Sequence, residues 1–126
     1  MKPLKSSDQS LAALLIDRKP CATAHITGLS AAPGICGTVR LYATPLGVVV
    51  TAEIDGLPQK TPRESYRVCF RAGKRLAVLT FASNGQCGEL THRFSVEDVL
   101  GHPVSICRSN SDDLPLAVGE VRGAAF

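Results

Sequence analysis

The feature that most constrains the fold is an alternation of apolar and polar residues that turn-forming residues repeatedly interrupt. Residues 22–28 and 36–43 alternate in this way, and successive side chains of a strand point to opposite faces of a sheet. Residues 48–54 are rich in β-branched side chains, which favour strands. Turn signals such as Pro45-Leu46-Gly47 and Asn84-Gly85 separate these runs. The pattern therefore predicts a sheet with one buried face.

The rest of the chain continues this pattern and gives seven or eight short strands, with no alternation of strands and helices and no internal repeat. The predicted strands are residues 22–28, 36–43, 48–54, 65–70, 86–94, 103–108 and 118–126, and the short apolar piece 76–81 would make the eighth. Residues 71–75 are predicted to form a basic turn. Residues 95–99 are predicted to form one helical turn, capped by Ser95 and Asp98 and ended by Gly101. Short, evenly spaced strands are typical of an all-β Greek-key sandwich or barrel.

A short helix is predicted over residues 7–18, ahead of the strands. Leu11, Leu14 and Leu15 would share one face of it. A helix of this length is marginal on its own, so we expect it to pack on the body of the protein or on a partner, with a frayed arm as the alternative. The predicted organisation is an N-terminal arm, residues 1–21, and one β domain, residues 22–126.

Composition and charge exclude several classes of function. With 44% apolar and 20% charged residues, the chain is globular rather than disordered. The net charge of +3 is small and the basic residues form no stripe, so nucleic acid is not an expected partner. No apolar run approaches the ~20 residues of a membrane span, and the start of the chain is too polar for a signal peptide. We therefore expect no membrane partner and a cytoplasmic location.

Five cysteines stand at wide, irregular intervals, and no two of them form a CxxC motif. They are Cys21, Cys36, Cys69, Cys87 and Cys107. An odd number at such spacing indicates neither a zinc knuckle nor a disulfide framework. We interpret them as reduced thiols that behave as small apolar residues.

Four segments share their order and spacing with one known family. They are GTVRLY (Gly37–Tyr42), VVVTAEIDGLP (Val48–Pro58), HRFSVEDVLGHPVSI (His92–Ile106), and the Asp112-Asp113 pair followed by a final strand that carries Arg122. Over roughly residues 22–126 the chain resembles the Cu/Zn superoxide dismutase family. The resemblance implies an eight-stranded Greek-key β-barrel. Because this family often dimerises through barrel faces, it also implies a homodimer or another protein partner.

The metal-binding part of the family pattern is missing from this sequence. Where the family carries a His-x-His pair that binds copper, this chain has Arg67 and Cys69. The last copper histidine would fall at Cys107, or at Arg108 if the position is counted back from the aspartate pair. Residues 71–85 contain no His, Asp or Glu, so the segment that would supply the zinc ligands is absent from the pattern.

These replacements predict that metal binding is lost. A guanidinium has no lone pair to donate to a metal, so Arg67 cannot act as a ligand. In the former copper pocket Arg67 could instead pair with Asp112 or Asp113. The resemblance gives Arg122 the family's anion-steering role, with a solvated arginine at the end of a strand as the alternative. We therefore expect no cofactor, no metal and no dismutase activity, and a pseudoenzyme that acts as a binding or assembly module.

Two alternatives remain open at this point. Cys69 and Cys107 both fall at former copper positions, so they could form a thiol site that binds Cu(I) or switches its redox state through a disulfide. Residual superoxide dismutase activity is the other alternative, through unrecognised ligands or a partner that completes the site. The three histidines, His25, His92 and His102, match no ligand position of the family.

Overall fold

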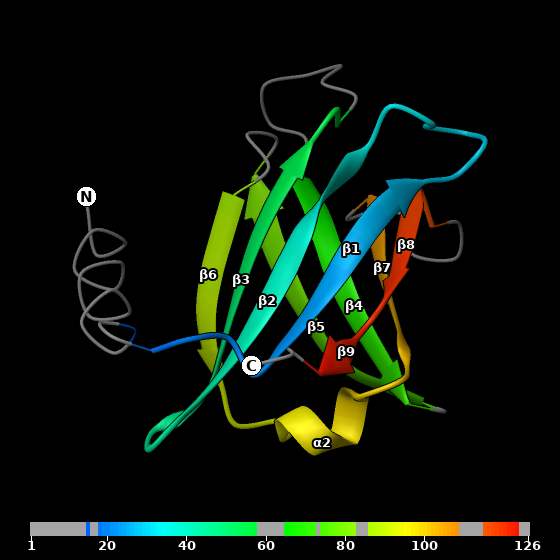
Figure 1. Cartoon of the computed structure of the whole chain (residues 1–126). Coiled ribbons are helices and arrows are strands. Elements are labelled where there is room, and N and C mark those ends of the chain that lie inside the picture. The colour runs from blue at the N-terminus through cyan, green and yellow to red at the C-terminus, as the bar shows by residue number, and fades with distance from the viewer. Residues whose placement is uncertain are drawn as a thin grey trace.

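The computed structural model describes residues 15, 18–57, 65–72, 74–82, 86–108 and 115–123. In these ranges the chain forms an antiparallel β-sheet that curls into a half-barrel, with one short helix at one end (Figure 1). The all-β prediction is therefore confirmed. The predicted N-terminal helix lies outside the described residues except at Leu15, which is helical, and Arg18, whose N–H donates to the Leu15 carbonyl at 3.0 Å.

Nine strands and one helix make up the described fold. They are β1 Ala22–Gly28, β2 Cys36–Thr44, β3 Gly47–Asp55, β4 Ser65–Ala72, β5 Lys74–Ala82, β6 Gln86–Thr91, α2 Val96–Val99, β7 Pro103–Arg108, β8 Ala117–Glu120 and β9 Arg122–Gly123. The first three strands agree with the predicted ones to within one residue at each end, and β7 agrees completely. The count exceeds the predicted seven or eight because the last predicted strand divides into β8 and β9.

Hydrogen-bonded neighbours follow the order β5-β4-β7-β8-β1-β2-β3-β6, and β9 pairs with β1. Every pairing is antiparallel. The two strands at the ends of this order, β5 and β6, are consecutive in the chain, and the curl of the sheet brings them near each other (Figure 1). One face of the sheet is thus turned inward around a shared core.

The core consists of the apolar side chains that the alternating sequence pattern places on one face of the sheet. Val39 and Leu41 of β2 are fully buried, as are Tyr66, Val68 and Phe70 of β4. All of them belong to one contiguous hydrophobic cluster. This burial is the main stabilising term of the fold, since each large apolar side chain removed from water contributes about 1.5–3 kcal/mol.

Among the described residues, three fully buried side chains point away from this core. Val49 lies between the core residues Val48 and Val50 of β3, so alternation places it on the outer face, yet its exposure is 0%. The same holds for Cys69 in β4 and Cys107 in β7, which are also 0% exposed and stand outside the core cluster. The outer face of the sheet is therefore covered at β3 and at the β4–β7 pair.

Two predicted boundaries are wrong. The predicted basic turn at residues 71–75 is almost entirely strand, because β4 runs to Ala72 and pairs with β5 from Lys74 onward, after a register shift at Phe70/Arg71. The predicted strand 86–94 ends at Thr91, whose hydroxyl accepts the N–H of Arg93 at 3.1 Å and turns the chain.

The end of the sheet near α2 is closed by two further contacts. Phe94 lies beyond β6 and packs against Phe70, with 5.1 Å between the ring centroids. The last predicted strand is interrupted at Val121, which exchanges backbone hydrogen bonds with the loop after α2: its N–H donates to His102, and Gly101 donates to its carbonyl. These contacts attach α2 to the barrel.

The helical turn predicted at residues 95–99 is confirmed as α2. Ser95 is its N-cap residue, and the Ser95 N–H donates to the Asp98 carboxylate at 2.9 Å. This is the reciprocal half of a capping box, which satisfies a backbone donor that the helix leaves unpaired. Val96 and Val99 are buried, so α2 covers one end of the barrel.

Replacement of Asp98 by alanine should destabilise the fold by about 1 kcal/mol, the usual cost of losing a capping side chain. Glu97→Ala is the matched control, because it removes an acidic group from the same turn without removing the hydrogen bond to Ser95. Urea denaturation of both variants measures the difference. Equal midpoints for the two variants would contradict a capping role for Asp98.

Candidate functional site

The β4–β7 pair brings together three of the residues that sequence analysis assigned to the former copper site. Arg67 of β4 lies directly opposite Cys107 of β7, and Cys69 lies directly opposite Ser105. Residues opposite each other in an antiparallel pair share a face, and so do residues two apart along a strand. All four side chains are therefore on the outer face, since Val68 and Ile106 between them belong to the core.

These four side chains differ in their access to solvent. Cys69 and Cys107 are fully buried, Ser105 is 8% exposed and Arg67 is partly buried. The Ser105 hydroxyl and the Cys107 thiol are 3.9 Å apart and form a weak hydrogen bond. A partly buried arginine therefore shares one face of the strand pair with two buried cysteines and a serine.

The register sets the two thiols diagonally rather than directly opposite each other. Diagonal positions of an antiparallel pair are about 7–8 Å apart, whereas disulfides need a Cα separation of about 4.4–6.8 Å. No disulfide joins the four cysteines whose side chains the structure describes, Cys21, Cys36, Cys69 and Cys107. Oxidation of this pair would thus require the two strands to shift.

The donor set on the β4–β7 face does not fit the copper–zinc centre of the resembled family. That centre requires imidazole ligands that suit both copper oxidation states, and here a guanidinium takes one position and thiols take two. Within the described residues, no group of three or more His, Cys, Asp or Glu side chains could hold a metal ion. Asp112, Asp113 and the Arg108 side chain lie outside the described residues.

Arg122 does not join this group. It is the first residue of β9, pairs with Thr23 of β1, and forms an exposed ion pair with Glu120 at 3.5 Å. The β7–β8 register pairs Ile106 with Ala117, and Arg122 lies five residues beyond Ala117 along the chain. At about 3.3 Å per residue this places it roughly 15–20 Å from Cys107. The geometry therefore gives Arg122 no position beside Arg67.

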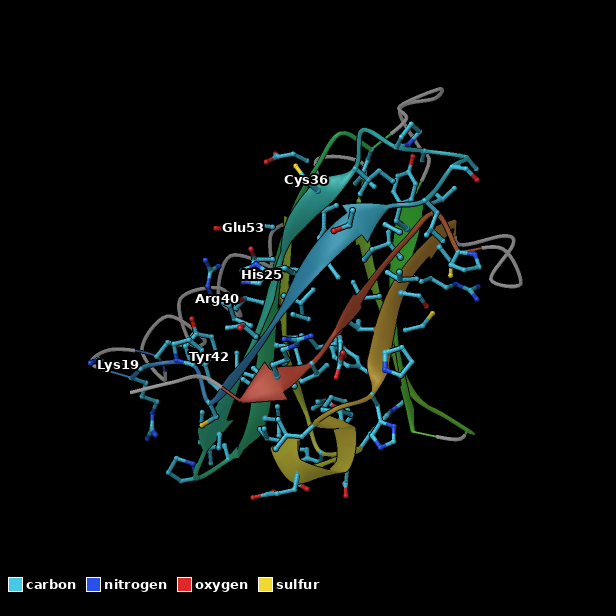
Figure 2. All side chains as sticks on the ribbon, turned by 45° about the vertical axis from the view of Figure 1, so that its right-hand side comes forward. Lys19, His25, Cys36, Arg40, Tyr42 and Glu53 are labelled. Atoms are coloured by element: carbon cyan, nitrogen blue, oxygen red, sulfur yellow. The ribbon has the colours of Figure 1, made fainter. Side chains whose placement is uncertain are left out.

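The histidines are also dispersed. His25 projects from the outer face of β1 (Figure 2), His92 follows β6, and His102 follows α2. All three are exposed. They lie in three separate parts of the described structure and share no strand pair.

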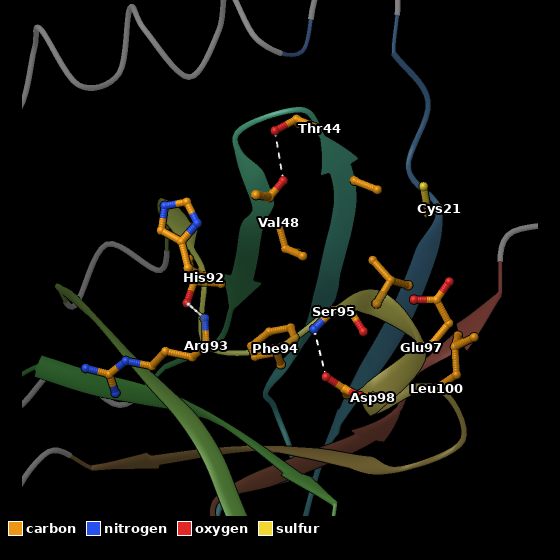
Figure 3. Close-up of a pocket in the computed structure, with 14 residues that line it drawn as sticks. Cys21, Thr44, Val48, His92, Arg93, Phe94, Ser95, Glu97, Asp98 and Leu100 are labelled. Carbon is orange, nitrogen blue, oxygen red and sulfur yellow. Dashed lines mark hydrogen bonds between the residues drawn. The ribbon is translucent and has the colours of Figure 1, made fainter.

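An open pocket of about 680 Å³ lies between the β2–β3 turn and α2 (Figure 3). Val48, Phe94 and Val96 contribute apolar surface, while His92, Arg93 and Glu97 contribute polar groups. The full lining is Cys21, Ala43, Thr44, Gly47, Val48, Thr91, His92, Arg93, Phe94, Ser95, Val96, Glu97, Asp98 and Leu100. This pocket is not apparent from the sequence, because its walls come from three separate parts of the chain that only the fold brings together.

Comparison of the chain with protein-family models, with curated proteins and with solved structures gave no match. In the described ranges, no helix combines the length and the apolar character needed to cross a lipid bilayer.

Proposed function

We propose that this chain is a superoxide-dismutase-like Greek-key barrel that has lost the metal chemistry and acts as a binding or assembly module. The strand order supports the Greek-key part of the proposal. Strands β4 and β5 form an antiparallel pair, the curl of the sheet brings β6 near β5 without a hydrogen-bonded pairing among the described residues, and β7 returns to pair with β4. A fourth strand that returns to pair with the first of three consecutive ones is the defining connection of a Greek key.

The observation that carries the proposed loss of metal chemistry is the β4–β7 register, in which Arg67 lies directly opposite Cys107. Arg67, Cys69 and Cys107, the last of which has Arg108 as its alternative in the family pattern, fall on one face of two adjacent strands, and this supports the proposal. Their side chains are nevertheless a guanidinium and two thiols. A guanidinium stays protonated and cannot ligate, so it puts a fixed positive charge where a cation would bind.

The binding role is supported by apolar side chains that remain exposed around the pocket. Leu46 stands at the tip of the β2–β3 turn, between the lining residues Thr44 and Gly47, and is 56% exposed. Leu100, on the opposite rim, is 37% exposed. Large apolar side chains that border a hollow are typical of surfaces that contact other molecules.

The proposal is tested by purifying the protein from cells supplied with copper and zinc and measuring its metal content and superoxide consumption. We expect substoichiometric copper and zinc, and a rate of superoxide loss equal to that of the buffer. Stoichiometric metal together with superoxide consumption would overturn the proposal. Stoichiometric copper that disappears in the Cys69→Ser/Cys107→Ser variant would replace it with the thiol-based Cu(I) site.

A further inference from the structure

The outer face of β2, β3 and β6 carries an apolar patch, which we call the outer patch and define as Tyr42, Val49 and Leu90. The β-sheet register places Tyr42 and Leu90 on either side of Val49, one on each neighbouring strand. Tyr42 and Leu90 are partly exposed, whereas Val49 between them is 0% exposed. Neighbours within a sheet shield a side chain laterally, so complete burial of Val49 requires a cover from outside the sheet.

The labelled side chains elsewhere on this face are polar, and none of the described ones among them offers such a cover. His25, Arg40 and Glu53 project from it toward solvent (Figure 2), and Arg40 pairs with Glu53 at 3.4 Å. The outer patch is therefore a local apolar area on a charged sheet, and it needs a ligand with apolar side chains.

The chain enters the fold beside this patch. The Arg18 guanidinium donates to the carbonyl of Ala43, the residue after Tyr42, at 3.4 Å. The Cys21 N–H donates to the Leu41 carbonyl at 2.8 Å. Any ordered structure formed by the residues before Arg18 therefore begins within reach of the outer patch.

The segment before Arg18 has the apolar side chains that the patch needs. Leu11, Leu14 and Leu15 are spaced i, i+3, i+4, which places them on one face of a helix. Leu15 is helical and partly buried, and its carbonyl accepts the Arg18 N–H, so at this position the described structure agrees with a helix. A helix of about twelve residues is marginal in water and gains its stability from packing of an apolar face.

We propose that residues 7–17 bind the outer patch as an amphipathic helix, with Leu11, Leu14 and Leu15 facing Val49. The outer patch then accepts the leucine face of a helix, and the arm of this same chain is its occupant. The inference stands independently of the proposed loss of metal chemistry, because it uses neither the β4–β7 face nor the family resemblance.

Cysteine cross-linking in the full-length protein tests the contact. In a background with Cys21, Cys36 and Cys87 changed to serine, Leu14→Cys is combined with either Tyr42→Cys or Leu90→Cys and oxidised with a disulfide-exchange reagent. Ala13→Cys is the matched control, because one residue along a helix rotates the side chain by about 100°. Circular dichroism verifies that each variant is folded.

We expect an intrachain disulfide with Leu14→Cys and little with Ala13→Cys, seen as a faster-migrating monomer on a non-reducing gel. A disulfide-linked dimer would overturn the proposal in favour of an arm exchanged with a second copy. Equal yields at both positions, or none, in folded protein would overturn it in favour of another occupant of the patch.

Proteolysis gives a second, independent measurement. Leu14→Asp should raise the rate of tryptic cleavage after Arg18 by about tenfold or more, because cleavage follows the population of undocked arm and each buried leucine contributes strongly to docking. Ala13→Asp should leave that rate near its natural value. Equal rates for the two variants would contradict a docked leucine face even if the cross-linking were positive.

Discussion

Changing Arg67, Cys69 and Cys107 together to histidine is expected to create a Cu(II) site that the natural chain lacks. The three positions occupy one face of the β4–β7 pair, with Arg67 directly opposite Cys107. Imidazole suits copper and zinc, and three imidazoles that converge from two strands would bind about one Cu(II) per chain. The substitution also removes the guanidinium charge that opposes a metal cation. Isothermal titration and visible absorption of the copper complex measure the gain.

A second triple-histidine variant serves as the control. It tests whether copper binding is specific to the β4–β7 pair or would occur at the same relative positions on any antiparallel strand pair. Thr51, Glu53 and Arg40 occupy the same relative positions on β3 and β2, with Arg40 directly opposite Thr51 and Glu53 two residues further along. If Thr51→His/Glu53→His/Arg40→His binds copper as tightly, a general sheet geometry is sufficient. In that case the resemblance of the β4–β7 face to a copper site loses its support, as it also does if the first variant folds and binds no copper.

The sheet itself was predictable because its alternation is strong where one face is buried and the other is solvated. In β2, Val39 and Leu41 are fully buried while Arg40 between them is partly exposed. The pattern fails where a strand carries charges at its end. Arg71 and Arg75 suggested a turn, yet they are paired residues of β4 and β5. Charged side chains are compatible with an exposed strand position, and composition alone cannot distinguish that position from a turn.

Burial on the outer face could have been detected at β3 but not at β4. Val48, Val49 and Val50 form an unbroken apolar run, and such a run indicates a strand that is covered on both faces. In β4, Cys69 is a small residue whose burial depends on which segments lie over it. The pocket near α2 was equally hidden, because it joins the β2–β3 turn to residues 91–100, and local patterns do not determine which distant segments meet.

Replacement of Gly56 by alanine should destabilise the protein by about 3 kcal/mol, through two separable effects. Gly56 has φ +81°, a left-handed conformation that costs a residue with a side chain about 1–2 kcal/mol. A Cβ atom at Gly56 would also lie 2.1 Å from the carbonyl oxygen of Gly34. Because that neighbour is backbone, it cannot rotate away, and the two loops beyond β1 and β3 would have to separate.

Gly101 isolates the first effect from the second. It has φ +78°, nearly the value of Gly56, and a Cβ atom there would meet nothing within 4 Å. Gly101→Ala should therefore cost only about 1 kcal/mol, and the difference of about 2 kcal/mol measures the close approach of the two loops. In thermal denaturation Gly56→Ala should lower Tm by about 10 °C and Gly101→Ala by about 4 °C. Equal losses of stability in the two variants would mean that Gly34 and Gly56 are not in contact in the folded protein. The loops after β1 and β3 would then lie further apart than in this structure.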